Sequence, residues 1–180
     1  MNSPVLTDGS AFFQLQEEFR AAFENTVIDM PRSMLIAYPH LMNDVNIAVV
    51  TTELTLASAR DSIRVLAWLK QNAPQCKVLV VANNVQPAVV EISRKDFEST
   101  IERKIDLLLP ADPKSLAQAA KLGQPVVEAI RGSKLSTGII SLAEIVAGSF
   151  ADMADAAPSD ANSTSKKNVF ASFKSMLKTK

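Results

Sequence analysis

The chain has 180 residues, of which 47% are hydrophobic, so its length predicts one domain with a short extension and its composition suffices for a core. Its 19 basic and 19 acidic residues balance, which excludes a global field that would draw the protein to nucleic acid. With one cysteine, no signal-peptide pattern and no apolar run near the roughly 20 residues that span a membrane, we expect a cytoplasmic protein.

The first predicted element is an amphipathic helix over 11–23, with Ser10 as its N-cap. A short apolar strand over 26–30 follows and ends just before Pro31. The segment "SMLIAYPHLM", residues 33–42, indicates a short helical connection. The apolar run "NIAVVTT", residues 46–52, is typical of a strand that is buried on both faces of a sheet.

A long helix is predicted over "LASARDSIRVLAWLKQN", residues 56–72, and Pro74 ends it. The next strand is "KVLVVANN", residues 77–84. Cys76 directly precedes this strand, which favours a packing role over a reactive thiol.

Four further elements complete the pattern. In "SRKDF", residues 93–97, a serine and an aspartate three positions later form a capping box that begins a short helix. A strand over 104–110 follows. In the helix after it, Asp112 is the predicted N-cap, Pro113 the first residue and Gly123 the end. A last helix covers about 137–147.

The alternation of strands and helices predicts an α/β fold, with a parallel sheet and helices on both faces. Ligands of such sheets bind outside the carboxyl ends of the strands. All four predicted ends are polar: 29–32, 51–53, 83–84 and 110–112. The sequence therefore predicts a binding site at one edge of the sheet. The alternative is that these ends are polar only because they meet solvent.

Residues 19–146 resemble the second half of a MinD/ParA-type P-loop ATPase and, more narrowly, the TadZ/CpaE family of Tad (Flp) pilus assembly proteins. The resemblance is carried by "VIDMPRS", "VVTTELTLASARDSIRVLAWLK", "VVANN" and "EISRKDFESTIERKIDLLLPADPKSLAQAAKLGQPVVE". It implies a protein that assembles or positions the Tad pilus secretion machinery. It also implies ATP and Mg²⁺ as cofactors and a homodimer as an assembly state.

The resemblance assigns roles to residues at the first and third strand ends. Asp29 matches the Walker B aspartate, which acts on Mg²⁺ directly or through water. Pro31 and Arg32 match the switch segment that follows this aspartate. Asn83 matches the asparagine that contacts the adenine edge.

Two further groups of residues receive implied roles. Pro110 and Asp112 match a loop that closes over the base. Arg60, Asp61 and Arg64 match a helical segment that lies near the nucleotide and the dimer interface in related ATPases. From the residues alone, these three charges are equally well explained as a solvated helix face with local ion pairs.

The sequence departs from the family in one large respect, because none of its five glycines lies in a G-x-x-x-x-G-K-[ST] phosphate loop. Without the amides and lysine of that loop the triphosphate is poorly held, and phosphoryl transfer depends on such positioning. We therefore expect an ATPase-fold scaffold with an incomplete nucleotide site, either a fragment or a shortened relative. The alternative is half of an ATP-hydrolysing MinD-like ATPase that another chain completes.

A less favoured alternative is a receiver-like domain in which Asp29 accepts a phosphoryl group and Thr51 is the switch hydroxyl. Such a domain needs an acidic pair after an upstream strand, whereas residues 1–22 indicate a helix. It also needs a lysine at the end of its last strand, where "LLLPAD" has none.

The composition changes near the end of the chain. Residues 148–165, "GSFADMADAAPSDANSTS", predict a flexible linker after a domain that covers 1–147. Residues 166–180 carry five lysines and no acid, which leaves a net charge of −5 on the first 165 residues.

On a helix, this basic tail has one apolar stripe with lysines beside it. The stripe comprises Val169, Phe170, Phe173, Met176 and Leu177, and the lysines include Lys166, Lys167, Lys174 and Lys178. This pattern predicts a helix that lies in the plane of a membrane or binds a partner, so we expect a peripheral contact with the inner membrane. The alternative is a frayed terminus that folds only on contact.

Overall fold

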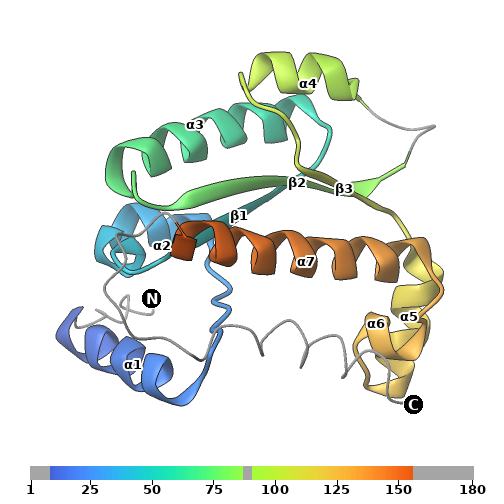
Figure 1. The fold of residues 1–180 in the computed structure, drawn as a ribbon. Helices are drawn as coiled ribbons and strands as arrows, with labels where there is room; N and C mark the ends of the chain where they lie inside the picture. Colours follow the sequence, from blue (N-terminus) through green and yellow to red (C-terminus); the bar gives the residue numbers. More distant parts are fainter. Residues whose placement is uncertain (1–8, 87–90, 156–180) are drawn as a thin grey trace, which may run out of the picture. The chain divides into compact units, whose positions relative to one another are not determined.

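The computed structural model describes residues 9–86 and 91–155 (Figure 1). The chain divides into two compact units, Met1–Leu108 and Leu109–Lys180. The elements of the first unit are α1 (Gly9–Ala22), α2 (Arg32–Ala37), the 3-10 helix η1 (Pro39–Met42), β1 (Ile47–Thr52), α3 (Leu56–Asn72), β2 (Lys77–Val85) and α4 (Arg94–Thr100). Strand β3 (Leu107–Pro110) spans the junction, and the second unit continues with α5 (Pro113–Leu122), α6 (Val126–Ala129) and α7 (Lys134–Asp155). None of the described helices is long and apolar enough to cross a membrane.

Three parallel strands form one sheet in the order β1–β2–β3. The register between β1 and β2 runs from Ile47 opposite Lys77 to Thr52 opposite Ala82. Parallel neighbours require a crossover connection, and α3 provides it between β1 and β2. The predicted α/β fold with a parallel sheet is confirmed. Helix α6 was not predicted from the sequence.

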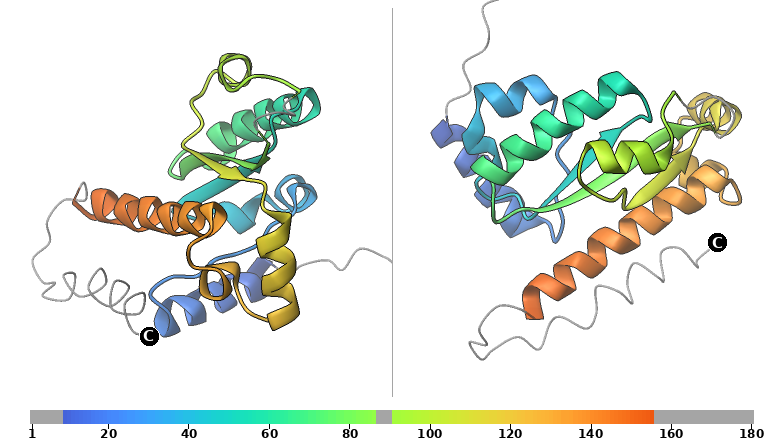
Figure 2. Two further views of the ribbon diagram at one scale, coloured as in Figure 1. Left: turned by 90° about the vertical axis from the view of Figure 1, so that its right-hand side faces the viewer. Right: turned by 90° about the horizontal axis from the view of Figure 1, so that it is seen from above.

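The core of the first unit lies between the sheet and helices α3 and α4, which Figure 2 shows on the same side of β1 and β2. Alternate residues of β2 face these helices, because successive strand side chains point to opposite faces. Val80 and Ala82 pack there with Phe97 of α4, and all three are fully buried. A second cluster at the other end of α3 contains Leu69 and the buried thiol of Cys76. Burial raises the pKa of this thiol, which agrees with a packing role.

Strand β2 is buried on both faces, whereas β1, for which this was predicted, is not. Ala48 and Val50 pack into the core on the α3 side, whereas Val49 is 39% exposed and Thr51 is also exposed on the opposite side. The apolar run therefore predicted the strand correctly and its burial wrongly. Burial of the second face requires a covering element, and sequence composition does not show whether one is present.

The strand predicted over 26–30 is wrong, because this segment is extended but pairs with no other strand among the described residues. Val27 is 97% exposed and Ile28 is 42% exposed. An apolar sequence with β-branched residues shows only that its side chains suit a strand. A strand also needs a neighbour that accepts and donates its backbone hydrogen bonds.

The helices before the sheet follow the prediction closely. Helix α1 covers most of the predicted span, although Ser10 lies inside its first turn rather than at the N-cap. Helix α2 and η1 occupy the predicted helical connection. The helix predicted over 56–72 has the same bounds as α3, and the Thr55 side chain accepts a hydrogen bond from the Ser58 N–H at its start.

The predicted capping box at α4 is present in part, because Ser93 caps the helix while the Asp96 carboxylate bonds the Ser93 hydroxyl instead of its backbone. The Ser93 hydroxyl accepts from the Asp96 N–H at 3.2 Å and donates to the Asp96 carboxylate at 2.6 Å. Strand β3 is shorter than the predicted 104–110, because the Asp106 side chain takes the place of a strand carbonyl. Its carboxylate accepts from the Val80 N–H at 2.7 Å, while its own N–H donates to the Val80 carbonyl at 2.8 Å.

The second unit begins with a helix whose ends match the prediction. Asp112 caps α5 by accepting from the Ser115 N–H at 3.0 Å, and Pro113 is the first helical residue. Gly123 ends α5 with a φ of 60°, a left-handed conformation that favours glycine.

Helix α7 is longer than the predicted 137–147 and continues to Asp155. The first eight residues of the predicted linker, 148–155, are therefore helical. The Ser149 hydroxyl is buried and donates to the Ile145 carbonyl at 2.8 Å, so this polar residue is satisfied within the helix. Small and polar composition suggested a linker, but alanine, methionine and phenylalanine in this stretch are compatible with a helix. The rest of the linker and the tail lie outside the described residues.

Candidate functional site

The carboxyl ends of β1 and β2 lie side by side, because Thr52 is opposite Ala82 in the register. Just beyond these positions the Asn84 amide donates to the Glu53 carboxylate at 3.4 Å. Asn84 has a φ of 55°, a left-handed conformation at the second-last position of β2. The predicted proximity of these two strand ends is confirmed, and the sequence contained no signal for the Glu53–Asn84 contact.

The side chains at these two ends differ in what they can bind. Thr52 is buried and its hydroxyl accepts from Ser62 of α3 at 3.0 Å, so it is committed to packing. Asn83 and Glu53 are exposed. The amide of Asn83 has no hydrogen-bond partner among the described residues and is free to contact a ligand. This edge therefore presents an amide and a carboxylate, which together can accept and donate hydrogen bonds to a heterocyclic base.

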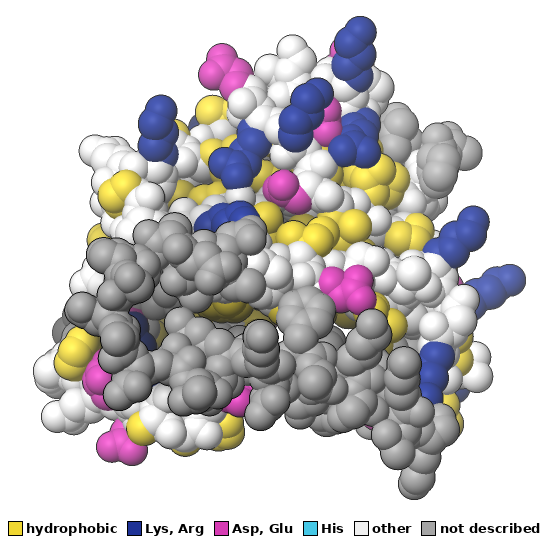
Figure 3. Space-filling view, in the orientation of Figure 1, with side chains coloured by type: hydrophobic (Ala, Val, Ile, Leu, Met, Phe, Trp, Pro, Cys, Tyr) yellow, Lys and Arg dark blue, Asp and Glu magenta, His cyan; other side chains and the backbone are white. Residues whose placement is uncertain are grey.

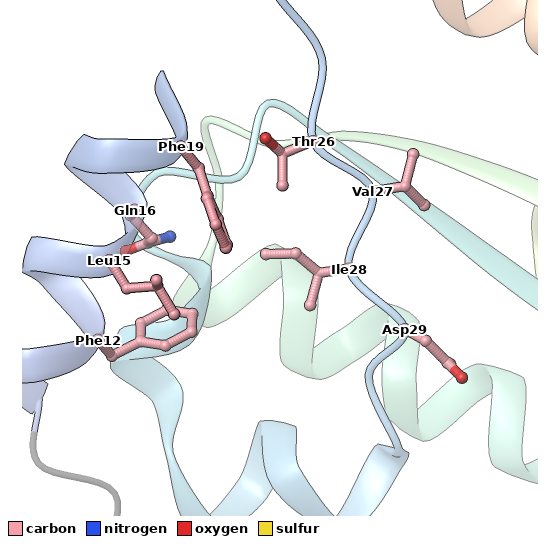
Figure 4. A pocket seen from close by; sticks show the side chains of 8 residues that line it. All are labelled: Phe12, Leu15, Gln16, Phe19, Thr26, Val27, Ile28 and Asp29. Atoms are coloured by element: carbon pink, nitrogen blue, oxygen red, sulfur yellow. The ribbon is translucent and has the colours of Figure 1, made fainter. Parts of the chain in front are cut away.

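Asp29 is exposed in the unpaired segment that precedes α2. The same segment and α1 enclose a hollow of about 340 Å³, lined by Phe12, Leu15, Gln16, Phe19, Thr26, Val27, Ile28 and Asp29. Figure 4 shows that Phe12, Phe19 and Ile28 point toward one another, whereas the Asp29 carboxylate points away from α1. The hollow is apolar and does not resemble a phosphate site.

The metal role of Asp29 stays a prediction. Among residues 9–86 and 91–155, no group of three or more His, Cys, Asp or Glu side chains is positioned to hold a metal ion. His40, the only histidine, packs edge-on against Phe12 and Tyr38 with ring centroids 6.5 and 6.0 Å apart. Any Mg²⁺ at Asp29 would therefore depend on water or a ligand for its remaining coordination.

Three of the predicted site residues form a charged cluster. The Asp61 carboxylate forms an ion pair with Arg32 at the start of α2 and a second one with Arg64, at 3.6 Å. The three side chains are half to two-thirds exposed, so each pair contributes little to stability, from zero to about 1 kcal/mol. The resemblance assigns Arg32 to the nucleotide site and assigns Asp61 and Arg64 to the dimer interface. In the structure, Asp61 forms ion pairs with both arginines. Arg60 is exposed and has no ion pair within the described part.

Pro110 and Asp112 belong to the second unit. Pro110 is the last residue of β3, and the Asp112 carboxylate caps α5. Hydrogen bonds from the Ser115 side chain and backbone lower the pKa of Asp112. This carboxylate therefore has a structural function, and its contact with a base stays a prediction. The tail residues predicted to bind a membrane or partner, Lys166, Lys167, Phe170, Phe173, Met176 and Leu177, lie outside the described residues.

Sequence reasoning missed Glu98, a carboxylate of α4 that accepts hydrogen bonds from three different residues. Its side chain is buried and accepts from Lys104 Nζ at 2.9 Å, Arg94 Nε at 2.8 Å and the Ile105 N–H at 3.0 Å. These bonds, led by that from Lys104, lower its pKa to about 2. Figure 3 shows basic side chains over α3 and α4. Glu98 forms ion pairs with two basic residues, Arg94 and Lys104. The four-residue spacing of Arg94 and Glu98 was the available signal.

No protein-family model matches the chain, and no curated protein matches it. Solved structures with the same fold include a ParA family ATPase from Chlorobium tepidum TLS, with a TM-score of 0.67 and 18% identity over 78% of this chain and 60% of that one. The cell division ATPase MinD of Pyrococcus furiosus has a TM-score of 0.65 and 20% identity, over 78% and 59% of the two chains.

A third match is the septum site-determining protein MinD from Pyrococcus horikoshii OT3, solved in complex with Mg-ADP. Its TM-score is 0.64 and its identity 19%, over 77% of this chain and 56% of that one. The chain thus spans about three fifths of the length of these structures. At these identities the likeness shows the fold alone, which is that of part of a ParA/MinD-like ATPase.

Proposed function

We propose that this chain, which has a partial ParA/MinD-like ATPase fold, is a scaffold protein of Tad (Flp) pilus assembly of the TadZ/CpaE type. One observation supports this most directly. The chain has the fold of part of a ParA/MinD-like ATPase over 78% of its length. The residue pattern from "EISRKDFE" to "GQPVVE" supports the narrower assignment to pilus assembly.

The residues of the chain fit an adenine contact better than a Mg²⁺–triphosphate contact. Asn83 presents an exposed amide at the carboxyl end of β2, without a hydrogen-bond partner among the described residues. Arg32 is engaged by Asp61, and Asp29 is a single exposed carboxylate. Phosphoryl transfer needs several charges held around the phosphates, and the described residues do not supply them. We therefore propose a structural role and derive no hydrolytic step for this chain.

A second candidate function is half of an ATP-binding ATPase that another chain completes. The observation that favours it is that segment 26–30 and the outer edge of β1 have no strand partner among the described residues, so a strand from another chain is able to pair with them. The two candidates differ in whether nucleotide binding is needed for function.

Nucleotide affinity of the chain alone is a direct test of the incomplete site. We expect ATP–Mg²⁺ to bind with a Kd in the millimolar range, near −4 kcal/mol, because no loop holds the triphosphate. Isothermal titration calorimetry on the full chain measures this affinity, and Asn83→Ala is the variant expected to weaken it further. A micromolar Kd would contradict the proposal and require an unrecognised phosphate site.

Pilus assembly in the source organism tests the function itself. We expect deletion of the gene to abolish surface pili, counted by electron microscopy, and the wild-type gene to restore them. Asp29→Ala should also restore them, because a scaffold needs no metal chemistry. Arg60→Glu with Arg64→Glu should not, because these exposed charges are the proposed partner surface. Normal pili in the deletion strain would refute the pilus role, and failure of Asp29→Ala alone would favour the completed ATPase.

The basic tail is proposed to add a peripheral membrane contact. Each lysine near an anionic bilayer contributes about 1 kcal/mol, and burial of the apolar stripe adds to this attraction. This part of the proposal rests on the sequence pattern of residues 166–180.

A further inference from the structure

Charge is segregated along the last part of the chain. After Lys134, residues 135–165 contain no base and four acids, which are Glu144, Asp152, Asp155 and Asp160. Residues 166–180 contain five lysines and no acid. Because the two segments are neighbours in one chain, their opposite charges meet at a high effective concentration. Helix α7 and the basic tail are therefore candidate partners for each other.

Helix α7 has a wide apolar surface that the rest of the described chain covers incompletely. Leu135 is the one buried apolar residue among 134–150, and Phe150 is 36% exposed. The apolar surface of a helix is normally packed against another element. Glu144 is exposed and has no hydrogen bond or ion pair among the described residues. An incompletely covered apolar helix with an unpaired acid fits an amphipathic helix that carries lysines.

One ridge of α7 combines two acids with an open space. Residues four apart form a ridge on a helix surface, and this ridge consists of Ile140, Glu144, Gly148 and Asp152. A side chain added at Gly148 would meet nothing within 4 Å, so there is open space along the ridge. The ridge beside it consists of small apolar residues, Ala143, Ala147 and Ala151. Short side chains of this kind allow a second helix to come close.

The basic tail, drawn as a helix, has two ridges that match those of α7. The first consists of Lys166, Phe170, Lys174 and Lys178. The second is apolar and consists of Val169, Phe173 and Leu177. The two lysines that flank Phe170 are eight residues apart, as are the two acids that flank Gly148. An antiparallel pairing therefore brings both lysines opposite both acids at once.

We propose that the basic tail, residues 166–180, packs antiparallel on α7 of the same chain. Lys174 then lies opposite Glu144, and Lys166 lies opposite Asp152. Phe170, between the two lysines, occupies the open space at the glycine of the ridge. The apolar ridge of the tail covers the alanine ridge of α7, and its burial adds the hydrophobic contribution that exposed ion pairs lack.

The segment between the two helices is long enough for this arrangement. Helix α7 ends at Asp155, so residues 156–165 connect it to Lys166. Antiparallel helices are joined by as few as about 2–5 residues. A short connection keeps the tail at a millimolar effective concentration, which a separate partner protein matches only when it binds tightly. The tail of the same chain is therefore favoured as the occupant of this face.

Docking on α7 and contact with a bilayer use the same apolar stripe of the tail, so the two exclude each other. Docking keeps the tail from a membrane until an anionic surface competes for its lysines. This consequence rests on the membrane contact proposed above, whereas the docking itself does not depend on it.

A nitroxide spin label on the tail of the full chain tests the docking. Ser172→Cys provides the attachment point, because the natural thiol of Cys76 is buried and burial raises its pKa. In NMR spectra, paramagnetic broadening is expected for the amides of residues 140–148. Absence of this broadening would overturn the proposal.

Charge exchange tests the pairing in the same labelled protein. Glu144→Lys should remove the broadening, and Glu144→Lys with Lys174→Glu should restore it, because the ion pair forms again with its charges exchanged. Glu128→Lys is the matched control, since it changes an exposed acid of α6 in the same way and is expected to keep the broadening. Broadening that persists in Glu144→Lys, or that is also lost in Glu128→Lys, would overturn the pairing.

Co-sedimentation with phosphatidylglycerol vesicles measures the competition between docking and membrane contact. Glu144→Lys is expected to lower the apparent Kd for vesicles about five-fold or more, because a docked tail is withdrawn from binding. Glu128→Lys adds the same charge on α6 and is expected to lower it by less than about two-fold. Equal decreases would show that the added charge attracts the vesicles and would overturn the competition. If no variant binds vesicles, the membrane contact fails, and the broadening experiment still decides the docking.

Discussion

Phe97→Ala is expected to lower the free energy of unfolding of the first unit by about 3–5 kcal/mol, because it removes a large side chain that the surroundings cannot replace. Phe97 is fully buried and packs with Val80 and Ala82 of β2 and with Ile101, which directly follows α4. A cavity at this position separates α4 from the sheet. Since single domains are stable by only about 5–15 kcal/mol, this variant is expected to approach the unfolding threshold.

Urea denaturation followed by the fluorescence of Trp68, the only tryptophan, measures this loss. Trp68 reports on the first unit, because it packs against the cluster around Leu69. Phe13→Ala is the matched control, since Phe13 is 55% exposed on α1, and its loss is expected to stay below about 1 kcal/mol. Similar losses for the two variants would mean that α4 does not pack on the sheet as described.

Glu98→Gln is expected to lower the melting temperature at pH 7, on the order of 5 °C, because it removes the charge that Arg94, Lys104 and the Ile105 N–H share. Glutamine keeps the shape of the side chain, but one end of its amide cannot accept a hydrogen bond. Glu91→Gln is the control, because Glu91 is exposed and has no hydrogen bond or ion pair among the described residues. A Glu91→Gln shift as large as that of Glu98→Gln would show a general charge effect instead.

The effect of Glu98 has a definite pH window. Its pKa is lowered in the folded state from an ordinary 4.5 to about 2, so its contribution to stability is fully present above pH 4.5. That contribution is lost as the pH falls from 4.5 through about 2. The difference in urea midpoint between wild type and Glu98→Gln should therefore be constant above pH 4.5 and shrink below it. A constant difference down to pH 2 would show that the variant acts through packing rather than charge.

The candidate site was predictable in part. Because parallel strands place their carboxyl ends on one edge, sequence order was enough to bring 51–53 and 83–84 together, and the structure confirms this with the Glu53–Asn84 contact. Sequence order was not enough to show that Asp61 forms ion pairs with both Arg32 and Arg64, since the Arg32–Asp61 pair depends on how α2 is placed against α3. Glu98 was missed for a similar reason: two of its partners come from the segment after α4, where spacing along a helix no longer applies.

The sequence by itself determined the elements whose signals are local. Helix α5 carries its own start and end in Asp112, Pro113 and Gly123, and the Ser93–Asp96 capping box begins α4 in the same way. Helix ends are satisfied by neighbouring residues of the same chain segment, so short motifs specify them. Only the tertiary structure decided which apolar segments are strands. Residues 26–30 and β1 have similar composition, yet β1 has β2 beside it and 26–30 has no described partner, and a strand exists only where another strand completes its hydrogen bonds.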